Sequence, residues 1–490
     1  MDEHEVKLLV NDLPLPDAAD LFAGVGEWSE ESIALEATYF DTTDLRLTRA
    51  GVSLRWRSDG AWTVKTPVDN AGDALVRHEH EFEGAAESPP AFVQELVLGW
   101  TRGARLEEVA HISTRRRQWR LLVHNEPSVE VDDDQVVTTS PFAPPAEFHE
   151  VEIELLSPDG RDGFHEVVER VRRRVGRSES PLPKIARALG PDALRAPDVP
   201  HPGRITRRAS LGELFQWRVA TSVYHFVNDD HRVRLGDEAS AIHQARVATR
   251  RLRADLQLFA PLFTGCASHD LQVELQWIGG LLGGVRDTDV MLARLRDHAI
   301  AAGEADRVDS LLAQLDHERD EQRTILLDAM GSPRYTRLLD ELVDLVNRPS
   351  PRPRRAAWRA SRHAPDLTNR SWKKLRRTVR ALPDNPSDDQ LHAVRKRAKH
   401  LRYAVEAVEP VTGAKTNRLA RRATQLQDVL GEHHDAVVAA QWLADTAIPS
   451  DTDDAFVAGE LAATFRAEAD TMRRHWRKAW KRTRRAHANL

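Results

Sequence analysis

Cysteine is almost missing from this chain: its 490 residues include one, Cys266. A single cysteine excludes an internal disulfide framework and a zinc site built on cysteines. Long apolar runs are missing too, because the closest approach to one, Ile278 to Val285, is short and broken by glycines. The first residues, Met1 to Glu5, are acidic where a signal peptide would be basic and then apolar. We therefore expect a soluble, cytoplasmic protein without a membrane partner.

The composition is that of a folded protein, with 41% hydrophobic and 30% charged residues, and the length suggests two or three domains. The net charge of −6 conceals an uneven distribution. Residues 1–204 hold 23 Lys and Arg against 38 Asp and Glu, whereas residues 205–490 hold 47 against 38. Such asymmetry predicts separate domains with different electrostatic roles.

A proline-rich segment at 196–204 marks the boundary and is interpreted as a linker. Before it, over residues 1–195, short alternating segments between turn-like clusters predict strands. After it, over residues 205–490, long stretches rich in Leu, Ala, Arg and Glu predict helices.

The helical part repeats itself. His243-x-x-Arg246-x-x-x-Arg250-x-Leu252-Arg253 matches His392-x-x-Arg395-x-x-x-Lys399-x-Leu401-Arg402 at an offset of 149. Leu282-Gly283-Gly284-Val285-Arg286-Asp287 matches Leu430-Gly431-Glu432-His433-His434-Asp435 at an offset of 148. Two matches at nearly constant offset predict two related copies, at about 205–348 and 354–490, that share a core.

In a strand, residues two apart share a face. By this rule, charged residues dominate one face of several predicted strands. These faces carry Glu3, Glu5 and Lys7; Arg55 and Arg57; Arg77, Glu79 and Glu81; Glu130, Asp132 and Asp134; and Glu150, Glu152 and Glu154. For any one strand a solvated sheet face would be the better interpretation. Five strands that each have one charged face and one apolar face favour a closed antiparallel barrel. The charged face would line a water-filled tunnel, and helices would cover the apolar face.

The residue types in this tunnel indicate a chemistry. Clustered carboxylates repel one another unless they hold a hard divalent cation, and oxygen ligands suit Mg²⁺ or Mn²⁺. Arginine and lysine in the same tunnel require an anion with several charges, and guanidinium groups match phosphate oxygens in pairs. A metal, a basic clamp and a polyanion together are typical of phosphoryl transfer or hydrolysis.

These residues resemble the CYTH superfamily, the triphosphate tunnel metalloenzymes, over about residues 1–195. The N-terminal Glu3-x-Glu5-x-Lys7 is similar to its ExExK signature. The further motifs follow in the family's order: Tyr39-Phe40-Asp41-Thr42, Leu54-Arg55-Trp56-Arg57, Lys65, Arg77-x-Glu79-x-Glu81, Glu150-x-Glu152-x-Glu154 and Lys184-Ile185-Ala186-Arg187.

The resemblance implies a role for each matching position. Glu3, Glu5, Glu152 and Glu154 would hold the metals. The phosphate-gripping residues would be Lys7, Arg55, Arg57, Lys65, Arg77 and Lys184, and Glu79, Glu81 and Glu130 would complete the tunnel. Arg115, Arg116 and Arg117 are consecutive, so the sixth-strand arginine is ambiguous; we favour Arg116 because the family places an aromatic three residues later, as Trp119 is here.

On a helix, residues three and four apart share a face. By this rule, the helical part has two stripes of cationic residues. One stripe holds His243, Arg246, Arg250 and Arg253, and the other holds His392, Arg395, Lys399 and Arg402. The alternative is a solvated face neutralised by nearby acids, but few acids lie at the neighbouring positions, Asp255 and Glu406 being the exceptions. A metal site at His243 and His392 is disfavoured, because the next positions of each stripe hold arginine or lysine, whose positive charge would repel a metal ion. Asp287 and Asp435 are assigned a structural role at a helix terminus.

This part resembles the CHAD family, the conserved-histidine α-helical domain, through His243 to Arg253, Leu391 to Tyr403 and Arg286-Asp287-x-Asp289. The resemblance implies a helical domain that binds inorganic polyphosphate through its basic face, which Lys373 and Arg377 would extend. Nucleic acid, another polyanion, is the weaker partner, because the stripes contain no aromatic side chains that could stack on bases.

The sequence thus predicts an α+β chain: a closed antiparallel β-barrel followed by an all-α bundle of two related halves. The expected function is metal-dependent hydrolysis of inorganic tripolyphosphate, with a second domain that binds long-chain polyphosphate and associates with polyphosphate granules. Thiamine triphosphatase and adenylyl cyclase remain alternatives in the same tunnel. A non-catalytic polyphosphate-binding or granule-targeting protein is the alternative from another class.

Overall fold

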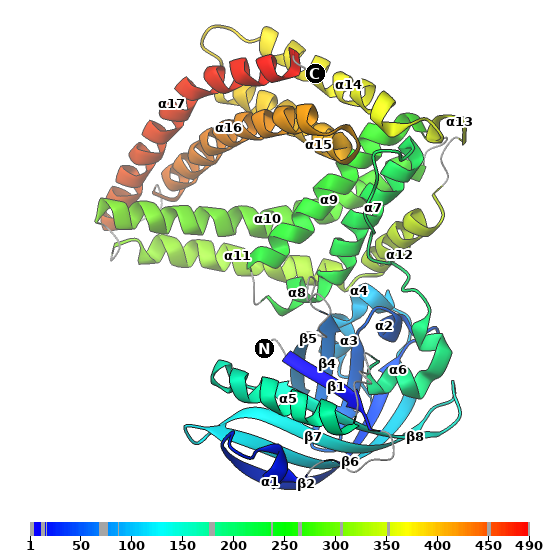
Figure 1. Cartoon of the computed structure of the whole chain (residues 1–490). Coiled ribbons are helices and arrows are strands. Elements are labelled where there is room, and N and C mark those ends of the chain that lie inside the picture. Colours follow the sequence, from blue (N-terminus) through cyan, green and yellow to red (C-terminus); the bar gives the residue numbers. More distant parts are fainter. Residues whose placement is uncertain are drawn as a thin grey trace. The chain divides into compact units, whose positions relative to one another are not determined.

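The structure, a computed structural model, divides into two compact units, Met1–Pro200 and His201–Leu490 (Figure 1). It describes residues 4–10, 15, 17–67, 77–86, 88–175, 182–236, 239–262, 267–303, 307–349, 353–447 and 452–488.

The first unit is built on one antiparallel sheet with the strand order β1-β8-β7-β6-β2-β3-β4-β5. The strands are β1 (His4–Leu9), β2 (Glu27–Asp41), β3 (Ser53–Arg57), β4 (Ala61–Pro67), β5 (Arg77–Glu83), β6 (Glu107–Val123), β7 (Glu126–Thr139) and β8 (Ala146–Leu155). Short helices connect or follow them: α1 (Ala18–Leu21), α2 (Arg46–Arg49), α3 (Ala91–Leu96), α4 (Leu98–Thr101), α5 (Arg161–Val175) and α6 (Lys184–Leu189).

The apolar face of the sheet is covered by helix, as the alternation predicts. Val131 of β7 and Ile153 of β8 are fully buried in one core, and Val167 and Val171 of α5 pack into the same core. Figure 1 shows α5 along this side of the sheet. The charged residues at the intervening positions must therefore face the other, concave side.

The prediction of a closed barrel is wrong: the sheet is open. Closure would require hydrogen bonds between its two edge strands, β1 and β5, and within the described residues these strands pair only with β8 and β4. The alternation of charged and apolar residues specifies which face points inward, and a curled open sheet satisfies that requirement as well as a barrel does.

Residues of the predicted linker are anchored at both of its ends. Arg49 donates hydrogen bonds to the Ala196 carbonyl, and the Asp198 carboxylate accepts from Arg49 and Arg102 in the first unit. In the second unit the Trp217 indole donates to the Gly203 carbonyl at 2.6 Å. The change from one unit to the other thus lies between Asp198 and Gly203.

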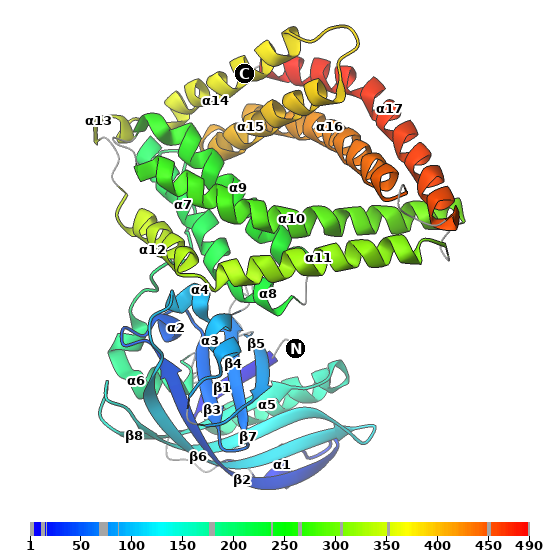
Figure 2. The same cartoon turned by 180° about the vertical axis from the view of Figure 1, so that it is seen from behind.

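The second unit is helical. Its first half contains α7 (Leu211–Asn228), α8 (Asp230–Leu235), α9 (Ala239–Phe259), α10 (Ala267–Ala302), α11 (Asp309–Met330) and α12 (Pro333–Asn347). Its second half contains α13 (Pro353–Ala356), α14 (Ala360–Arg380), α15 (Asp388–Thr412), α16 (Ala414–Ala447) and α17 (Thr452–Ala488). In Figure 2, α10 runs beside α11 and α16 runs beside α17, and both pairs are in contact.

Apolar cores hold the helical unit together. One core joins α10 and α11 of the first half to α16 and α17 of the second, through residues such as Leu295, Leu315, Leu443 and Phe465. A second core lies within the second half, where α14, α15, α16 and α17 pack around Trp372 and Trp476. None of the described helices has both the length and the apolar character that a membrane span requires.

Two valines on the same face of β7 provide a matched test of this packing. Val131 is completely buried beneath α5, whereas Val137, six residues further on, is 42% exposed. We predict that Val131→Ala lowers the free energy of unfolding by about 2 kcal/mol, because it removes buried methyl groups and leaves a cavity. Val137→Ala should change it by less than about 0.5 kcal/mol. Urea unfolding followed by tryptophan fluorescence measures both, and equal effects would contradict the assignment of the covered face.

Candidate functional site

The concave face of the sheet encloses a cavity of about 290 Å³ to which all eight strands contribute. Its charged lining is formed by Glu5, Lys7, Arg55, Arg57, Lys65, Glu79, Glu81, Arg116, Glu130, Asp132, Glu152, Glu154 and Lys184. The cavity thus brings together twelve of the side chains predicted from the sequence, and adds Asp132. Of the other predicted positions, Glu3 lies outside the described residues, as does the side chain of Arg77.

The three consecutive arginines of β6 separate cleanly. Arg116 lines the cavity and pairs with Asp132, Asp134 and Glu152. Arg117 lies on the other face, where it pairs with Asp133 at 3.0 Å. The structure therefore places in the cavity the arginine that was favoured by its distance from Trp119.

Glu152 is the centre of the cavity's charge network. Its carboxylate contacts Lys7, the Lys184 ammonium at 2.9 Å and the Arg116 guanidinium at 3.2 Å. Burial alone would raise the pKa of Glu152, but Lys184, Lys7 and Arg116 together hold that pKa well below its usual range. Burial likewise opposes the charge of Lys7, yet Glu152 and Glu5 keep the Lys7 pKa above its ordinary value. Each charge here is stable only because its partners are present.

Three further carboxyls surround this network. Lys184 lies 2.7 Å from Asp134 and 3.2 Å from Glu150. Burial, reinforced by repulsion from Glu130 and Asp134, raises the pKa of Asp132 to about 7, although Arg116 opposes the shift. Burial also raises the pKa of Glu150. Asp132, Asp134 and Glu150 were not among the predicted site residues, although their alternation with Glu130 and Glu152 was the signal that could have identified them.

A second group of cations lies on β3 and β4. Lys65 contacts Glu79 at 2.9 Å, Arg55 contacts the same carboxylate at 3.5 Å, and Arg57 lies 3.5 Å from Glu81. Arg55 also donates to the hydroxyl of Tyr39 at 3.4 Å. Burial would raise the pKa of Tyr39, but the neighbouring Arg55 guanidinium outweighs it and lowers that pKa. Tyr39 thus joins the site through a motif that the sequence had singled out without assigning it a role.

Three carboxylates form a row across the sheet. Glu5 of β1 is the register partner of Glu154 of β8, which is in turn the partner of Glu130 of β7. Like charges directly opposite one another destabilise a sheet, and all-oxygen ligands suit a hard divalent cation. Lys7 lies 2.8 Å from Glu5, and Arg120 lies 2.8 Å from Glu130. Among the residues that the structure describes, no three such side chains converge on one point. The oxygen donors of the row are of the kind that Mg²⁺ or Mn²⁺ prefers.

The two cationic stripes lie on α9 and α15, and equivalent residues make equivalent contacts. Arg246 pairs with Asp287 of α10, at 2.5 Å, and Arg395 pairs with Asp435 of α16, at 3.7 Å. Gly283 and Gly431 lie beneath these arginines, where a Cβ would stand 3.6 and 3.8 Å from the respective Nε atoms. The helix-terminal role predicted for the two aspartates is wrong, since both lie inside long helices and act as partners of the stripes.

The stripes approach each other where α9 meets α15. The Arg250 guanidinium lies over the ring of Tyr403, with its Cζ 5.9 Å from the ring centroid. Burial, together with the positive charges of Arg250, Arg395 and Arg246, lowers the pKa of Lys399 to about 7. The Nε atoms of Arg250 and Arg395 are buried and have no hydrogen-bond partner among the described residues. This surface therefore has more positive charge than its neighbours neutralise.

A further histidine belongs to this surface. The ring of His434 lies 4.0 Å, centroid to centroid, from that of His392. Burial, followed by the nearby His392 and Arg395, lowers the pKa of His434 to about 4, so its imidazole is neutral near pH 7. This proximity could not be predicted from the sequence pattern, because the two residues lie on different helices. Lys373 and Arg377 lie exposed on a third helix, α14.

Not every stripe cation is free of acids. Arg402 pairs with Glu406 at 2.6 Å, and Arg253 donates a hydrogen bond to Gln276. Asp255, the other acid noted in the sequence, is buried and pairs with Arg218 rather than with a stripe residue. The surplus of positive charge is therefore concentrated at Arg250 and Lys399, since Arg395 also has an acidic partner in Asp435.

Comparison with known families agrees with this division of the chain. The CYTH domain model matches residues 1–183, and the CHAD domain model matches residues 219–444. A structure of the CHAD domain from the plant Ricinus communis is 24% identical and covers 57% of this chain and 94% of that chain, with a TM-score of 0.47.

Two curated relatives differ in how much of the chain they match. A thiamine-triphosphatase of Macaca fascicularis is 33% identical over 137 residues, which are 24% of this chain and 58% of that protein. An uncharacterized protein of Mycobacterium tuberculosis is 30% identical over 472 residues, which are 90% of this chain and 87% of that protein. The chain belongs to the CYTH and CHAD families, with a CYTH domain followed by a CHAD domain.

Proposed function

We propose that the first unit is a metal-dependent inorganic triphosphatase and that its substrate lies along the concave face of the sheet. The observation that supports this most strongly is the lining of the cavity, where two groups of cations on the concave face of the sheet face one shared space. Lys7, Arg116 and Lys184 form one group, and Arg55, Arg57 and Lys65 form the other. A linear polyanion could contact both groups at once.

The charge of the lining supports a metal. Among the described residues, six basic and seven acidic side chains line the cavity, so this part of the lining does not offer a positive site. A triphosphate would bring several negative charges and would be repelled by the carboxylates unless divalent cations entered with it. Glu5, Glu130 and Glu154, together with the predicted Glu3 and Glu152, would hold Mg²⁺ or Mn²⁺.

The roles of the chain's residues follow from their positions. The two groups of cations would fix the triphosphate and align the bond to be broken. When bound, a divalent metal supplies neutralisation of charge on the transferred phosphoryl group. Asp132, whose pKa lies near neutrality, would accept a proton from the attacking water.

Thiamine triphosphate is the second candidate substrate. The similarity to a thiamine-triphosphatase falls in one stretch of 137 residues and reaches 33% identity. Thiamine triphosphate would use the same phosphate contacts, so the two substrates are distinguished by turnover rather than by the charged lining.

The second unit would bind long-chain polyphosphate through the two stripes. Arg250 and Lys399 come from different halves. Burial and then repulsion from Arg250 lower the pKa of Lys399, and burial with repulsion from cations that include Arg402 and Arg395 lowers the pKa of Arg250. A polyanion that lies between the stripes would relieve this repulsion and release counterions. Binding of this kind could also draw the enzyme to polyphosphate granules.

Replacing a carboxylate of the row by an amide tests the metal assignment. We predict that Glu5→Gln reduces metal-dependent tripolyphosphate hydrolysis about 100-fold or more while the fold persists, because the shape is kept and a metal-binding charge is lost. Glu30→Gln, at an exposed position of β2, is the matched control and should retain activity. Phosphate release with Mg²⁺, with Mn²⁺ and with EDTA measures the effect, and thiamine triphosphate and ATP are assayed in parallel. Normal turnover by Glu5→Gln would make the metal assignment wrong.

The titration of Lys399 generates a prediction about pH. Its pKa is about 7 in the free protein, and a bound polyanion must raise it, so binding takes up a proton. Polyphosphate affinity should therefore be greatest below pH 7 and decrease as the pH rises above 7. In Lys399→Arg the side chain stays charged, and this decrease should be smaller. Calorimetric titration of both proteins with long-chain polyphosphate between pH 6 and pH 9 measures it.

Two further variants test whether the stripes act together. Arg250→Ala and Lys399→Ala should each weaken polyphosphate binding at low salt and flatten its salt dependence, and the double variant should weaken it more. Unchanged affinity in the double variant would place the site elsewhere. Equal competition by duplex DNA would instead favour nucleic acid as the partner.

A further inference from the structure

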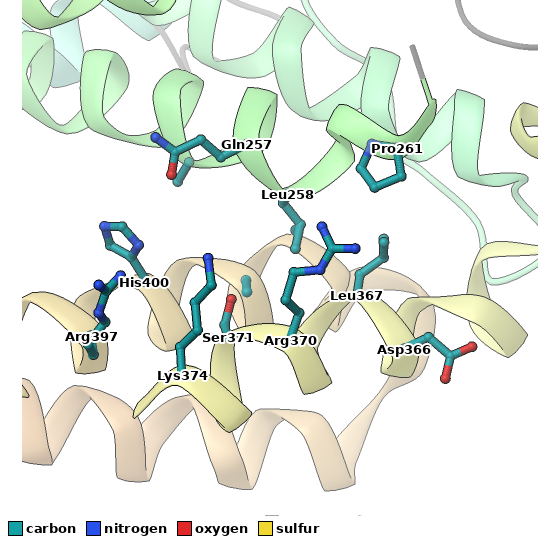
Figure 3. Close-up of a pocket in the computed structure, with 12 residues that line it drawn as sticks. Gln257, Leu258, Pro261, Asp366, Leu367, Arg370, Ser371, Lys374, Arg397 and His400 are labelled. Atoms are coloured by element: carbon teal, nitrogen blue, oxygen red, sulfur yellow. The ribbon is translucent and has the colours of Figure 1, made fainter. Parts of the chain in front are cut away.

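A second pocket, open to solvent on its polar side, lies in the helical unit and is lined by α9, α14 and α15 (Figure 3). Its volume is about 270 Å³. Figure 3 shows Arg370, Ser371 and Lys374 rising from α14 toward Gln257 and Leu258 of α9, with His400 and Arg397 of α15 at one end. This size is near the lower limit of pockets that hold small molecules.

The polar side of the pocket consists almost entirely of hydrogen-bond donors without partners. Arg370, Lys374 and Arg397 form no ion pair or side-chain hydrogen bond with any residue that the structure describes, and neither does His400. The single acid in the lining, Asp366, points away from these cations in Figure 3. These three exposed cations line one pocket, so an anion that enters it can contact all of them.

The other side of the pocket is apolar. Leu258 and Pro261 come from the end of α9 and the turn that follows it, and Leu367 comes from α14. Ala254 and Ala404 complete this surface. A bare phosphate chain would gain nothing from such a wall, whereas an organic group attached to a phosphate would bury apolar surface against it.

The pocket is distinct from the two cationic stripes. Arg397, His400 and Ala404 lie about 150° around α15 from the stripe of His392, Arg395, Lys399 and Arg402, at 100° per residue. On α9 the pocket uses the last turns, from Ala254 onward. The buried Tyr403, with the Arg250 guanidinium over its ring, lies between the two faces of α15.

We propose that this pocket binds a small organic phosphate, whose phosphoryl group contacts Arg370, Lys374 and Arg397 and whose carbon skeleton packs on Leu258, Pro261 and Leu367. Ser371 and Gln257 supply further polar groups at the phosphoryl end. The site is independent of the proposed triphosphatase activity, because it lies wholly within the helical unit.

Phenyl phosphate is a probe with the two required parts. Calorimetric titration of the full chain is done in EDTA, which withholds metal from the first unit. Phenyl phosphate should bind this pocket at least tenfold more tightly than inorganic phosphate or tripolyphosphate does. The double variant Arg370→Ala/Lys374→Ala should weaken phenyl phosphate binding at least tenfold, and Arg397→Ala should weaken it through a different helix. Arg380→Ala, an exposed α14 arginine outside the lining, should leave it unchanged.

The apolar wall has a test of its own. Leu367→Asn should reduce the affinity for phenyl phosphate at least fivefold and leave the weak binding of inorganic phosphate unaltered, and unchanged circular dichroism shows that each variant is folded. The proposal is overturned if phenyl phosphate binds no better than inorganic phosphate, or if its affinity is the same in Arg370→Ala/Lys374→Ala and in Arg397→Ala as in the parent. It is also overturned if tripolyphosphate competes for this pocket more tightly than phenyl phosphate, because the pocket would then hold bare phosphate chains.

Discussion

Burial of charge on the concave face of the sheet is the constraint on which the first unit depends. A carboxylate enclosed by protein stays ionised only when cations compensate for the lost water. Glu152 satisfies this condition through Lys7, Lys184 and Arg116, which come from β1, α6 and β6. These elements must therefore meet around one carboxylate, and the sheet must curl so that they can. Loss of any one of these cations would leave the buried network with an excess of negative charge. The four side chains are therefore expected to behave as a unit.

The helical unit meets the opposite condition. Its stripes gather cations with too few acids to balance them, and Lys399 responds with a pKa of about 7. The acids that are present, Asp287 and Asp435, each hold one arginine in place without neutralising the surface as a whole. In our proposal both units receive phosphate polyanions, and they differ in how charge is supplied. On this proposal the sheet would need a divalent metal because its described lining is nearly balanced in charge. The helices already carry a surplus of positive charge.

Much of the site could be predicted because alternation along a strand is a local property. Glu5, Lys7, Arg55 and Glu152 all lie where their parity placed them, and the spacing to Trp119 separated Arg116 from Arg117. Closure of the barrel could not be predicted, since it depends on whether two edge strands from distant parts of the chain pair. Asp132 was on the predicted face but was not assigned to the site, because its role depends on its burial beside Arg116.

The helical unit shows the same limit. The repeat predicted that Arg246 and Arg395 would lie in equivalent settings, and each pairs with an aspartate of the following long helix. That those aspartates lie in the middle of helices, and that His434 lies against His392, depends on how α9, α10, α15 and α16 pack. Helical periodicity identifies a face, and it does not identify what that face meets. The pocket beneath α9 has the same origin, since its lining comes from three separate stretches of sequence and its cations from two of them.

The most direct measurement is a crystal structure of the full chain with Mn²⁺ and tripolyphosphate, with diffraction recorded at the manganese absorption edge. Our account predicts an anomalous peak beside Glu5, Glu154 and Glu130, with the phosphate chain extending along the concave face between Lys184 and Arg55. An anion bound away from this face, or a phosphate chain in the cavity with no manganese beside the carboxylates, would contradict it.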